Sequence, residues 1–345
     1  MIGSDSIDLG LENIWRSWFL FRKGKKRSNE ITRFEYRLEE NLFRLHGDLI
    51  RGIYQPGPYR SFEVTDTKRR TIAVTQIRDR VVHRLLYEHL VTIFDRRFVY
   101  DAWSCRKGKG VTGAIARAQS FLRNHPDWFV WRADITKFFD HIERVILLNC
   151  LRRRISDTKA LELFSRIIAH APDPKPHARE RERESKEPRG IPIGNLTSQI
   201  FANIYLHELD WHIKQHIRAK YYVRYGDDFI ILAPTFEEIT RLRAHVCTFL
   251  LSALRLEINN RHDRIVPARQ GIHFLGVYIY PYRRQLNRRN WRRAQRLVSL
   301  RNYSSYRGIV QSHERRGRRR RYAWHTHILS RDQRKGHAWA VINRW

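Results

Sequence analysis

Cysteines, acidic side chains and long apolar runs are all scarce in this sequence. The three cysteines, Cys105, Cys150 and Cys247, lie far apart and lack the spacing of a metal site, which favours reduced thiols in a cytosolic protein. No apolar run approaches the ~18 residues that a membrane-spanning helix requires, and residues 1–5 lack the basic and apolar regions of a signal peptide. We therefore expect a cytoplasmic chain without a membrane partner.

The charge is strongly unbalanced toward cations. Lysine and arginine number 67 against 35 acidic residues, which gives a formal net charge of +32. Such an excess indicates a polyanionic partner. Nucleic acid fits better than a membrane surface or a heparin-like polymer, the alternative, because aromatic residues, 12% of the chain, are spread along it. The length of 345 residues allows one large domain or a few subdomains.

The most informative stretch runs from Tyr222 to Leu232 and contains Tyr225-Gly226-Asp227-Asp228. The apolar residues around this motif predict a strand, a tight turn and a second strand, with Gly226 giving the tip its backbone freedom. Two adjacent carboxylates contribute little to packing, and a third one nearby would repel them unless a divalent cation lay among them. A solvated turn is the alternative, since glycine and aspartate are common turn residues.

A third carboxylate ends another predicted strand. Residues 128–135 form an apolar run with Asp134 near its end, whereas Asp140 is typical of a helix start. Asp134 and the two aspartates of the hairpin could form a cluster that binds two Mg²⁺, with Mn²⁺ as a substitute. Because such a pair of ions stabilises the attacking and leaving oxygens of phosphoryl transfer, the residues alone predict a nucleotidyl transferase.

Two flanking segments carry further candidates. Residues 62–74 alternate like two strands around a basic turn at 68–70, whose cations suit a triphosphate. Downstream, Gly194 allows the backbone to approach a ligand closely. The helix that follows it is expected to be capped by Thr197 or Ser198.

Several motifs, in a fixed order, give the chain a resemblance to a known family. They are Arg78-Asp79-Arg80, Asp134-Ile135-Thr136-Lys137-Phe138-Phe139-Asp140, Ile191-Pro192-Ile193-Gly194, Tyr225-Gly226-Asp227-Asp228 and Phe274-Leu275-Gly276. Over residues 50–282 the chain resembles a reverse transcriptase. The resemblance implies an α+β right-hand polymerase fold. Its expected parts are a basic N-terminal helix and fingers at 1–126, a palm with an antiparallel sheet at 127–282 that contains a charged insertion loop at 171–190, and a short helical, arginine-rich thumb and tail at 283–345.

The resemblance also implies roles for individual residues. Asp134, Asp227 and Asp228 would be catalytic and, with Ile135, would form the metal site. Phe139 would exclude a ribose 2′-hydroxyl and so select deoxynucleotides; a core aromatic ring beside its neighbour is the alternative. The expected nucleotide contacts are Lys68, Arg70, Arg78, Phe139, Ile193 and Gly194. The expected template or primer contacts are Gln199, Tyr225, Phe274, Leu275 and Gly276.

The segment from Ile193 to Gln199 indicates a subfamily. Most reverse transcriptases have Gln-Gly and then Ser-Pro at these positions, and Ile193 and Gln199 are similar to the enzymes of diversity-generating retroelements. Residues 103–110 and 305–308 also look like that group. The likeness implies error-prone copying of a template RNA in a bacterial or phage setting, with dNTPs, an RNA–DNA duplex and a small basic oligomeric accessory protein as partners. The alternatives are a retron, phage-defence or compact group II-like reverse transcriptase, and a non-catalytic RNA-binding scaffold.

Overall fold

The computed structural model describes residues 6–65, 69–172, 188–299, 302–324 and 326–327. The chain packs as two compact units that interleave along the sequence. The helix-rich unit comprises Met1–Gly108, Ile135–Arg218 and Ala244–Asn259, and the sheet unit comprises Lys109–Asp134, Ala219–Arg243 and Asn260–Trp345. This division runs through the expected palm, so the boundaries of fingers, palm and thumb stay a prediction.

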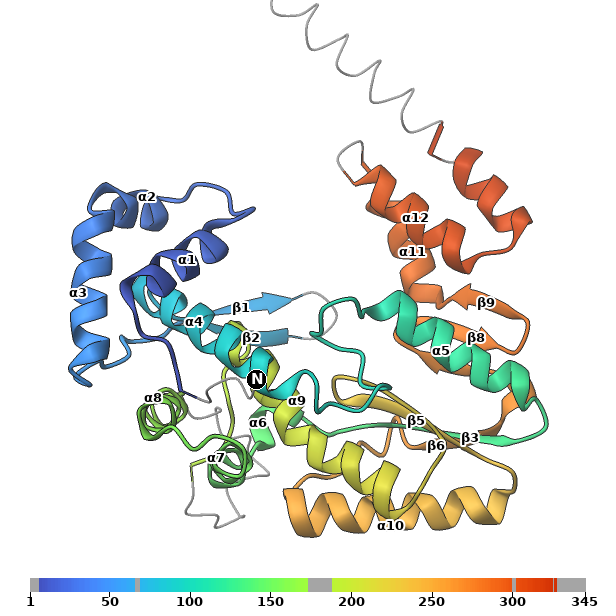
Figure 1. Ribbon diagram of the computed structural model, residues 1–345. Coiled ribbons are helices and arrows are strands. Elements are labelled where there is room, and N and C mark those ends of the chain that lie inside the picture. Colours follow the sequence, from blue (N-terminus) through green and yellow to red (C-terminus); the bar gives the residue numbers. More distant parts are fainter. Residues whose placement is uncertain (1–5, 66–68, 173–187, 300–301, 325, 328–345) are drawn as a thin grey trace, which may run out of the picture. The chain divides into compact units, whose positions relative to one another are not determined.

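The helix-rich unit consists mainly of α-helices with one β-hairpin (Figure 1). Its elements are α1 (Leu11–Arg22), α2 (Asn29–Tyr36), α3 (Leu38–Ile50), β1 (Arg60–Thr65), β2 (Arg69–Val74), α4 (Ile77–Phe94), α6 (Phe138–His141), α7 (Arg144–Arg152), α8 (Thr158–Ala169), α9 (Leu196–Trp211) and a π-helical turn (His212–His216). Helix α10 (Phe236–Leu254) begins in the sheet unit and ends in this one.

The spacing of apolar side chains explains how these helices pack. In α1, Ile14, Trp18 and Phe21 recur at helical intervals and are all buried, where α1 packs on α4. Helix α9 buries most of its residues, Phe201 and Tyr205 among them, as expected for a helix enclosed on nearly all sides. Helix α4 packs against α9, so these two helices form the centre of the unit.

The sheet unit contains two antiparallel sheets, of four and three strands, in the orders β4-β5-β3-β6 and β7-β8-β9. Helix α5 packs on β4 and on β8. The elements are α5 (Val111–Asn124), β3 (Phe129–Asp134), β4 (Tyr221–Tyr225), β5 (Asp228–Ala233), β6 (Arg264–Pro267), a 3₁₀ turn (Ala268–Gln270), β7 (Ile272–Phe274), β8 (Val277–Tyr280), β9 (Arg283–Leu286), α11 (Arg288–Arg296) and α12 (Tyr303–His313).

The interior strands of the larger sheet form the core of this unit. Strand β5 is buried from Phe229 to Ala233, an unbroken apolar run that fits a strand covered on both faces. Trp131 on β3 is also buried, and its ring meets the edge of the Phe229 ring at a centroid distance of 5.4 Å. The predicted strands at the aspartate hairpin and before Asp134 are therefore confirmed.

Two expected helix starts are wrong. Asp140 lies inside α6, and α7 begins after a different N-cap, Glu143. Asn195 occupies the N-cap position of α9 without a side-chain capping hydrogen bond, and neither of the two hydroxyl residues expected there lies at that position. Thr197 instead lies in the first turn, with its hydroxyl 2.7 Å from Nδ1 of the buried His83 on α4. A tertiary hydrogen bond thus takes the hydroxyl that local sequence assigns to a cap.

The predicted hairpin at residues 62–74 is confirmed by the pairing of β1 with β2. Its expected basic turn at 68–70 is wrong in part, because Arg69 and Arg70 pair within β2, and Lys68 lies outside the described residues. Most of the expected insertion loop at 171–190 also lies outside them. Among the helices that are described, none combines the length and the apolar character needed to cross a membrane.

Candidate active site

The aspartate motif forms the tip of the β4–β5 hairpin. Tyr225 pairs with Asp228 as the last rung of the ladder, which leaves Gly226 and Asp227 as a two-residue loop. Gly226 has φ +64°, as required at the first loop position of a type II′ hairpin turn. The tight turn therefore sets Asp227 and Asp228 at the end of the sheet.

The register of β3 against β5 brings a third carboxylate to this end. Asp134 pairs directly with Asp228; Asp134 is half-buried, and the side chain of Asp228 is largely buried. Like charges directly opposite each other on neighbouring strands destabilise a sheet. A cation between the two carboxylates would remove that repulsion, so the register itself suits metal binding.

Asp228 has further partners within the sheet unit. Arg132 on β3 donates from Nε to Oδ1 over 3.0 Å and from Nη2 to Oδ2 over 2.9 Å, and the backbone N–H of Leu275 also donates to this carboxylate. Burial nevertheless raises the pKa of Asp228 to about 6, and the charge of Asp134 raises it as well. An ionised carboxylate has about four lone-pair sites, so these contacts leave room for a cation.

The donor set at this edge fits Mg²⁺ better than it fits a metal held by the protein alone. Within the described ranges, no three His, Cys, Asp or Glu side chains are grouped as a ready metal site. Mg²⁺ usually binds one or two carboxylates and completes its octahedron with water and substrate phosphates. The opposed pair Asp134 and Asp228 meets that requirement. Ile135, the other residue expected at the metal, is buried and forms a bridge with Ile258.

The expected nucleotide-contacting residues lie in the helix-rich unit, and backbone hydrogen bonds bring several together. The N–H of Ala73 on β2 donates to the carbonyl of Ile193 over 3.0 Å, and the N–H of Ile191 donates to the carbonyl of Phe139 over 2.9 Å. Phe139 is half-buried beside Phe138, with 5.4 Å between the ring centroids. Both interpretations of Phe139, a selective ring and a core aromatic, are compatible with this position.

Gly194 is required where the chain passes β2. Its φ is +131°, and a Cβ atom there would lie 2.9 Å from the carbonyl oxygen of Ala73 and 2.9 Å from Cγ2 of Ile72. Only glycine fits such a close approach of two backbones. The sequence motif around Ile193 is thus fixed against the hairpin whose strand β2 also contains Arg70.

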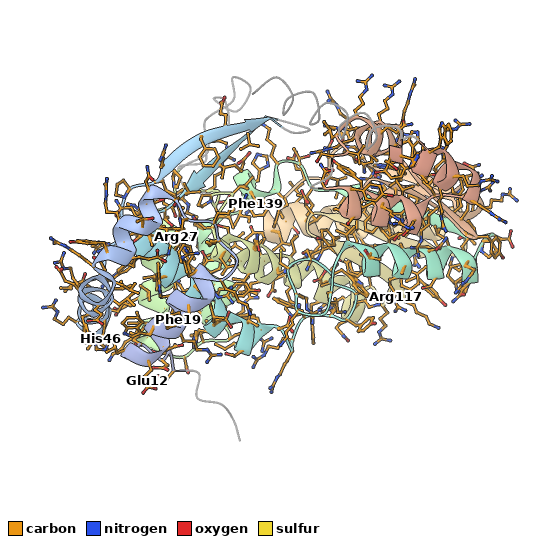
Figure 2. All side chains as sticks on the ribbon, turned by 90° about the horizontal axis from the view of Figure 1, so that it is seen from above. Glu12, Phe19, Arg27, His46, Arg117 and Phe139 are labelled. Atoms are coloured by element: carbon orange, nitrogen blue, oxygen red, sulfur yellow. The ribbon has the colours of Figure 1, made fainter. Side chains whose placement is uncertain are left out.

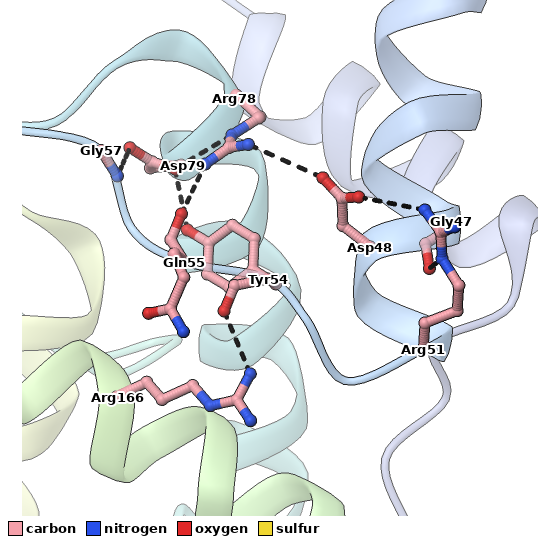
Figure 3. Close-up of polar contacts among 9 residues, drawn as sticks. All are labelled: Gly47, Asp48, Arg51, Tyr54, Gln55, Gly57, Arg78, Asp79 and Arg166. Carbon is pink, nitrogen blue, oxygen red and sulfur yellow. Dashed lines mark hydrogen bonds and ion pairs between the residues drawn. The ribbon is translucent and has the colours of Figure 1, made fainter.

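Arg78 lies in a polar network at the start of α4 (Figure 3). Its guanidinium donates to the carbonyl of Gln55 over 2.5 Å and lies 3.4 Å from Asp79 and 3.7 Å from Asp48. The hydroxyl of Tyr54 donates to buried Asp79 over 2.8 Å. These contacts give Arg78 a structural role in holding the segment before β1, and its expected triphosphate contact stays a prediction.

The expected primer and template residues are divided between the units. Gln199 is exposed in the first part of α9, whereas Tyr225 is half-buried at the end of β4. Phe274 is buried, and the two residues after it form the β7–β8 turn with φ +51° at Leu275 and +81° at Gly276. The turn is thus built by two consecutive residues in left-handed conformation.

The helix-rich unit also contains a basic cavity of about 1010 Å³. It lies among α2, α3 and the segments that precede β1 and begin α4. Five arginines and one glutamate are among its lining side chains, which favours an anionic occupant. These charged lining residues are Glu30, Arg33, Arg37, Arg44, Arg60 and Arg78. Figure 2 shows further nitrogen-tipped side chains around the C-terminal helices of the sheet unit.

The sequence motifs missed two residues at the site, Arg132 and His273. Arg132 lies two positions before Asp134, so on a strand both side chains face the same way, and this spacing was the available signal. Nothing in the local sequence marks His273, whose Nδ1 lies 3.2 Å from Nη1 of Arg132.

Comparison with known proteins agrees with the geometry. The family model described as reverse transcriptase (RNA-dependent DNA polymerase) matches residues 61–279. Protein YkfC of Escherichia coli K12 is 24% identical over 283 residues, which are 71% of this chain and 72% of YkfC. The group II intron-encoded protein LtrA of Lactococcus lactis is 26% identical over 180 residues, 51% of this chain and 29% of LtrA.

Two further matches have lower sequence identity. The putative COX1/OXI3 intron 2 protein of Saccharomyces cerevisiae is 22% identical over 340 residues, 80% of this chain and 39% of that protein. A solved structure of Candida albicans telomerase with a telomeric RNA fragment aligns with a TM-score of 0.48 and 13% identity, over 74% of this chain and 53% of the other. The chain thus spans well under half the length of the intron proteins. Because the family model covers more than half of the chain, the protein belongs to the reverse transcriptase family of RNA-directed DNA polymerases and has its right-hand polymerase fold.

Proposed function

We propose that this chain makes cDNA on a template RNA by two-metal nucleotidyl transfer. The observation that carries the proposal is the direct pairing of Asp134 with Asp228 at the ends of β3 and β5, with Asp227 in the adjoining turn. Asp134, Asp227 and Asp228 would hold the divalent cations, which when bound lower the pKa of a primer 3′-hydroxyl and neutralise the leaving pyrophosphate.

The residues near the Ile193 motif would hold the incoming nucleotide. Gly194 is exposed, so its backbone would be accessible to a base or sugar, and Phe139 would leave no room for a 2′-hydroxyl. Lys68 and Arg70 in the β1–β2 hairpin would contact the triphosphate. Positioning of this kind lowers the barrier because the reacting atoms start near attack distance.

The net positive charge and the lining of the basic cavity support RNA as the template. The formal net charge of +32 and the arginine-lined cavity would attract a phosphate backbone. Aromatic side chains in the same cavity, Phe34 and Tyr36, offer rings on which unpaired bases stack. Helix α11, in the described part of the tail, has five arginines and no acidic residue among its nine residues. This helix would bind the RNA–DNA duplex.

We assign the chain, as the finer proposal, to the error-prone enzymes of diversity-generating retroelements. Ile193 replaces an amide side chain beside the nucleotide, and the loss of that hydrogen-bonding group would weaken discrimination between bases. Gln199 at the start of α9 also matches that group. Copying would then be error-prone at template adenines and would involve a small basic oligomeric accessory protein.

A second candidate is a compact reverse transcriptase related to group II introns. The matches with LtrA and with the yeast intron 2 protein favour it, although each covers a minor part of the longer protein. A template repeat paired with a variable repeat beside the gene would favour the retroelement, and an intron RNA structure around the gene would favour the intron relative.

Primer extension tests the activity and the subfamily together. Wild type, Asp227→Ala and the exposed-site control Glu237→Ala would be supplied with Mg²⁺, dNTPs and RNA templates with or without adenine, in the presence and absence of any co-encoded basic protein. We expect synthesis by wild type and Glu237→Ala and none by Asp227→Ala. Substitutions concentrated opposite adenine support the retroelement, whereas faithful products favour the intron relative. Failure of wild type on every template contradicts polymerase function and favours an RNA-binding scaffold.

A further inference from the structure

We propose that Arg132, His273 and Asn287 are positioning residues that tie the carboxylate of Asp228 to the start of α11. This inference rests on the proposed polymerase function, because Asp228 belongs to the proposed metal site. All of these residues lie in the sheet unit, and each contact between consecutive members is a described one.

The first link is the bidentate pair of Arg132 with Asp228. Both side chains are largely buried, with 12% and 14% of their surface exposed. A planar guanidinium that holds both oxygens of a carboxylate fixes its rotation as well as its position. Arg132 therefore sets the direction in which Asp228 presents its remaining lone pairs.

The second link is His273 on β7. Its Nδ1 lies 3.2 Å from Nη1 of Arg132, and its Nε2 lies 3.0 Å from Nδ2 of Asn287. Arginine and an amide nitrogen are both donors, whereas an imidazole has at most one acceptor nitrogen. His273 can therefore accept a hydrogen bond from Arg132 or from Asn287, but not from both at once.

The third link is Asn287, the N-cap of α11. Its Oδ1 accepts from the N–H of Asn290 over 2.7 Å, so turning the amide over to suit His273 would cost the helix its cap. The backbone N–H of Asn287 donates to the carbonyl of Gly276 over 3.2 Å. Since the neighbouring Leu275 N–H donates to Asp228, the contacts close into a ring.

The ring joins two surfaces that the proposed reaction uses. One is the carboxylate end of β3 and β5, and the other is the arginine-rich helix α11. The contacts therefore hold the orientation of Asp228 against the start of the helix that the proposed function assigns to the duplex.

Kinetics on matched variants test the inference. The test variants are Arg132→Gln, the charge-keeping Arg132→Lys, and Asn287→Ser, which keeps a good N-cap but is too short to reach His273. Arg243→Gln is the control, because Arg243 forms an equivalent bidentate pair with Asp263 in the same unit.

We expect Arg132→Gln to lower kcat by about 10–100-fold, the usual effect of losing a residue that orients a metal ligand. KM for the primer–template should stay within about twofold of wild type, because Arg132 contacts no nucleic acid in this scheme. Arg132→Lys should recover part of the loss, Asn287→Ser should show a smaller loss, and Arg243→Gln should keep kcat. An unchanged kcat for Arg132→Gln in folded protein overturns the inference.

Hydrogen exchange gives a readout that needs no activity. Loss of Arg132 should speed exchange of the amides in residues 272–276 and in the first turn of α11, and Arg243→Gln should leave both unchanged. If wild type makes no DNA but these amides respond, the polymerase proposal fails and the contact ring stands. If wild type is active and the amides do not respond to Arg132→Gln, the ring is contradicted.

Discussion

Two arginine–aspartate pairs of the sheet unit share their chemistry and differ in their consequence. Arg132 holds both oxygens of Asp228, and Arg243 holds both oxygens of Asp263. Each carboxylate has one further donor, the Leu275 N–H in the first pair and the indole N–H of Trp131, at 2.8 Å, in the second. Yet burial raises the pKa of Asp228 to about 6, whereas the hydrogen bonds to Asp263 hold its pKa below the usual value.

Position in the sheet explains the difference. Asp228 begins an interior strand and faces Asp134, so the loss of water and a second carboxylate both oppose its charge. Asp263 comes just before the edge strand β6. Its side chain is 10% exposed, close to the 14% of Asp228, but its partner Arg243 keeps 40% of its side-chain surface exposed. The same ion pair is therefore structural at the edge, while in the interior it leaves a carboxylate whose charge a cation would stabilise.

The largest expected contrast is in catalysis. Asp228→Asn keeps the shape of the side chain but removes its charge, so DNA synthesis should fall by about 10³-fold, corresponding to several kcal/mol of lost transition-state stabilisation. Asp263→Asn should stay within about twofold of wild type per folded molecule. Single-turnover nucleotide incorporation, with circular dichroism to confirm folding, measures both. Equal losses in the two variants would remove the distinction between the pairs.

The next contrast is in pH dependence without divalent cations. Because the folded pKa of Asp228 lies above its unfolded value, the native state binds more protons there, and its contribution to stability falls as pH rises from about 4 to 6. The full effect is about 3 kcal/mol. Asp263 has the opposite sign, because its contribution is present above about pH 4 and is lost as pH falls further.

Urea unfolding at several pH values measures these slopes. The free energy of unfolding of wild type minus that of Asp228→Asn should decline between pH 4 and 6, while the same difference for Asp263→Asn should rise with pH below about 4. A flat difference for Asp228→Asn would show that its carboxyl has an ordinary pKa in the folded protein.

The two arginine–aspartate pairs also separate features that the sequence alone predicts from features that it does not predict. The apolar run before Asp134 and the turn residues of Tyr225-Gly226-Asp227-Asp228 are local signals, and the structure confirms both strands and the turn. The family itself follows from the order of motifs. The strands and the turn can be predicted from the sequence because strand alternation and turn conformation depend on residues that are neighbours in the chain.

Features that depend on the pairing register of strands could not be predicted from the sequence alone. Arg132 meets Asp228 only because β3 pairs with β5 in one register, and a shift by one residue would turn Arg132 to the other face. Thr197 failed as a cap because His83, far away in sequence, takes its hydroxyl. The sequence predicts that Arg78 contacts a phosphate, but in the structure its guanidinium interacts with the carboxylate of Asp48 and the carbonyl of Gln55 (Figure 3).

Stability should separate the pairs by a smaller margin. Asp263→Ala leaves Arg243 and the indole of Trp131 without their shared acceptor, which should cost about 2 kcal/mol, less than the ~3–5 kcal/mol of a fully buried pair because Arg243 is partly exposed. Asp228→Ala also relieves repulsion with Asp134, so its cost should be lower than that of Asp263→Ala at pH 7. Chemical denaturation at one pH compares the two. A larger loss for Asp228→Ala would mean that Arg132 outweighs burial and repulsion together.

The smallest contrast is in salt dependence, and it bears on the same physical distinction. A double-mutant cycle gives the coupling energy of each pair, with Arg→Gln and Asp→Asn changes at 132 and 228 or at 243 and 263. Raising the ionic strength from about 0.1 to 1 M shortens the Debye length from about 10 to 3 Å. Since Arg243 is 40% exposed and Arg132 only 12%, the coupling of the edge pair should weaken by a few tenths of a kcal/mol and that of the interior pair should hardly change. Equal weakening would place Asp228 in contact with bulk solvent, and the raised pKa would then need a cause other than burial.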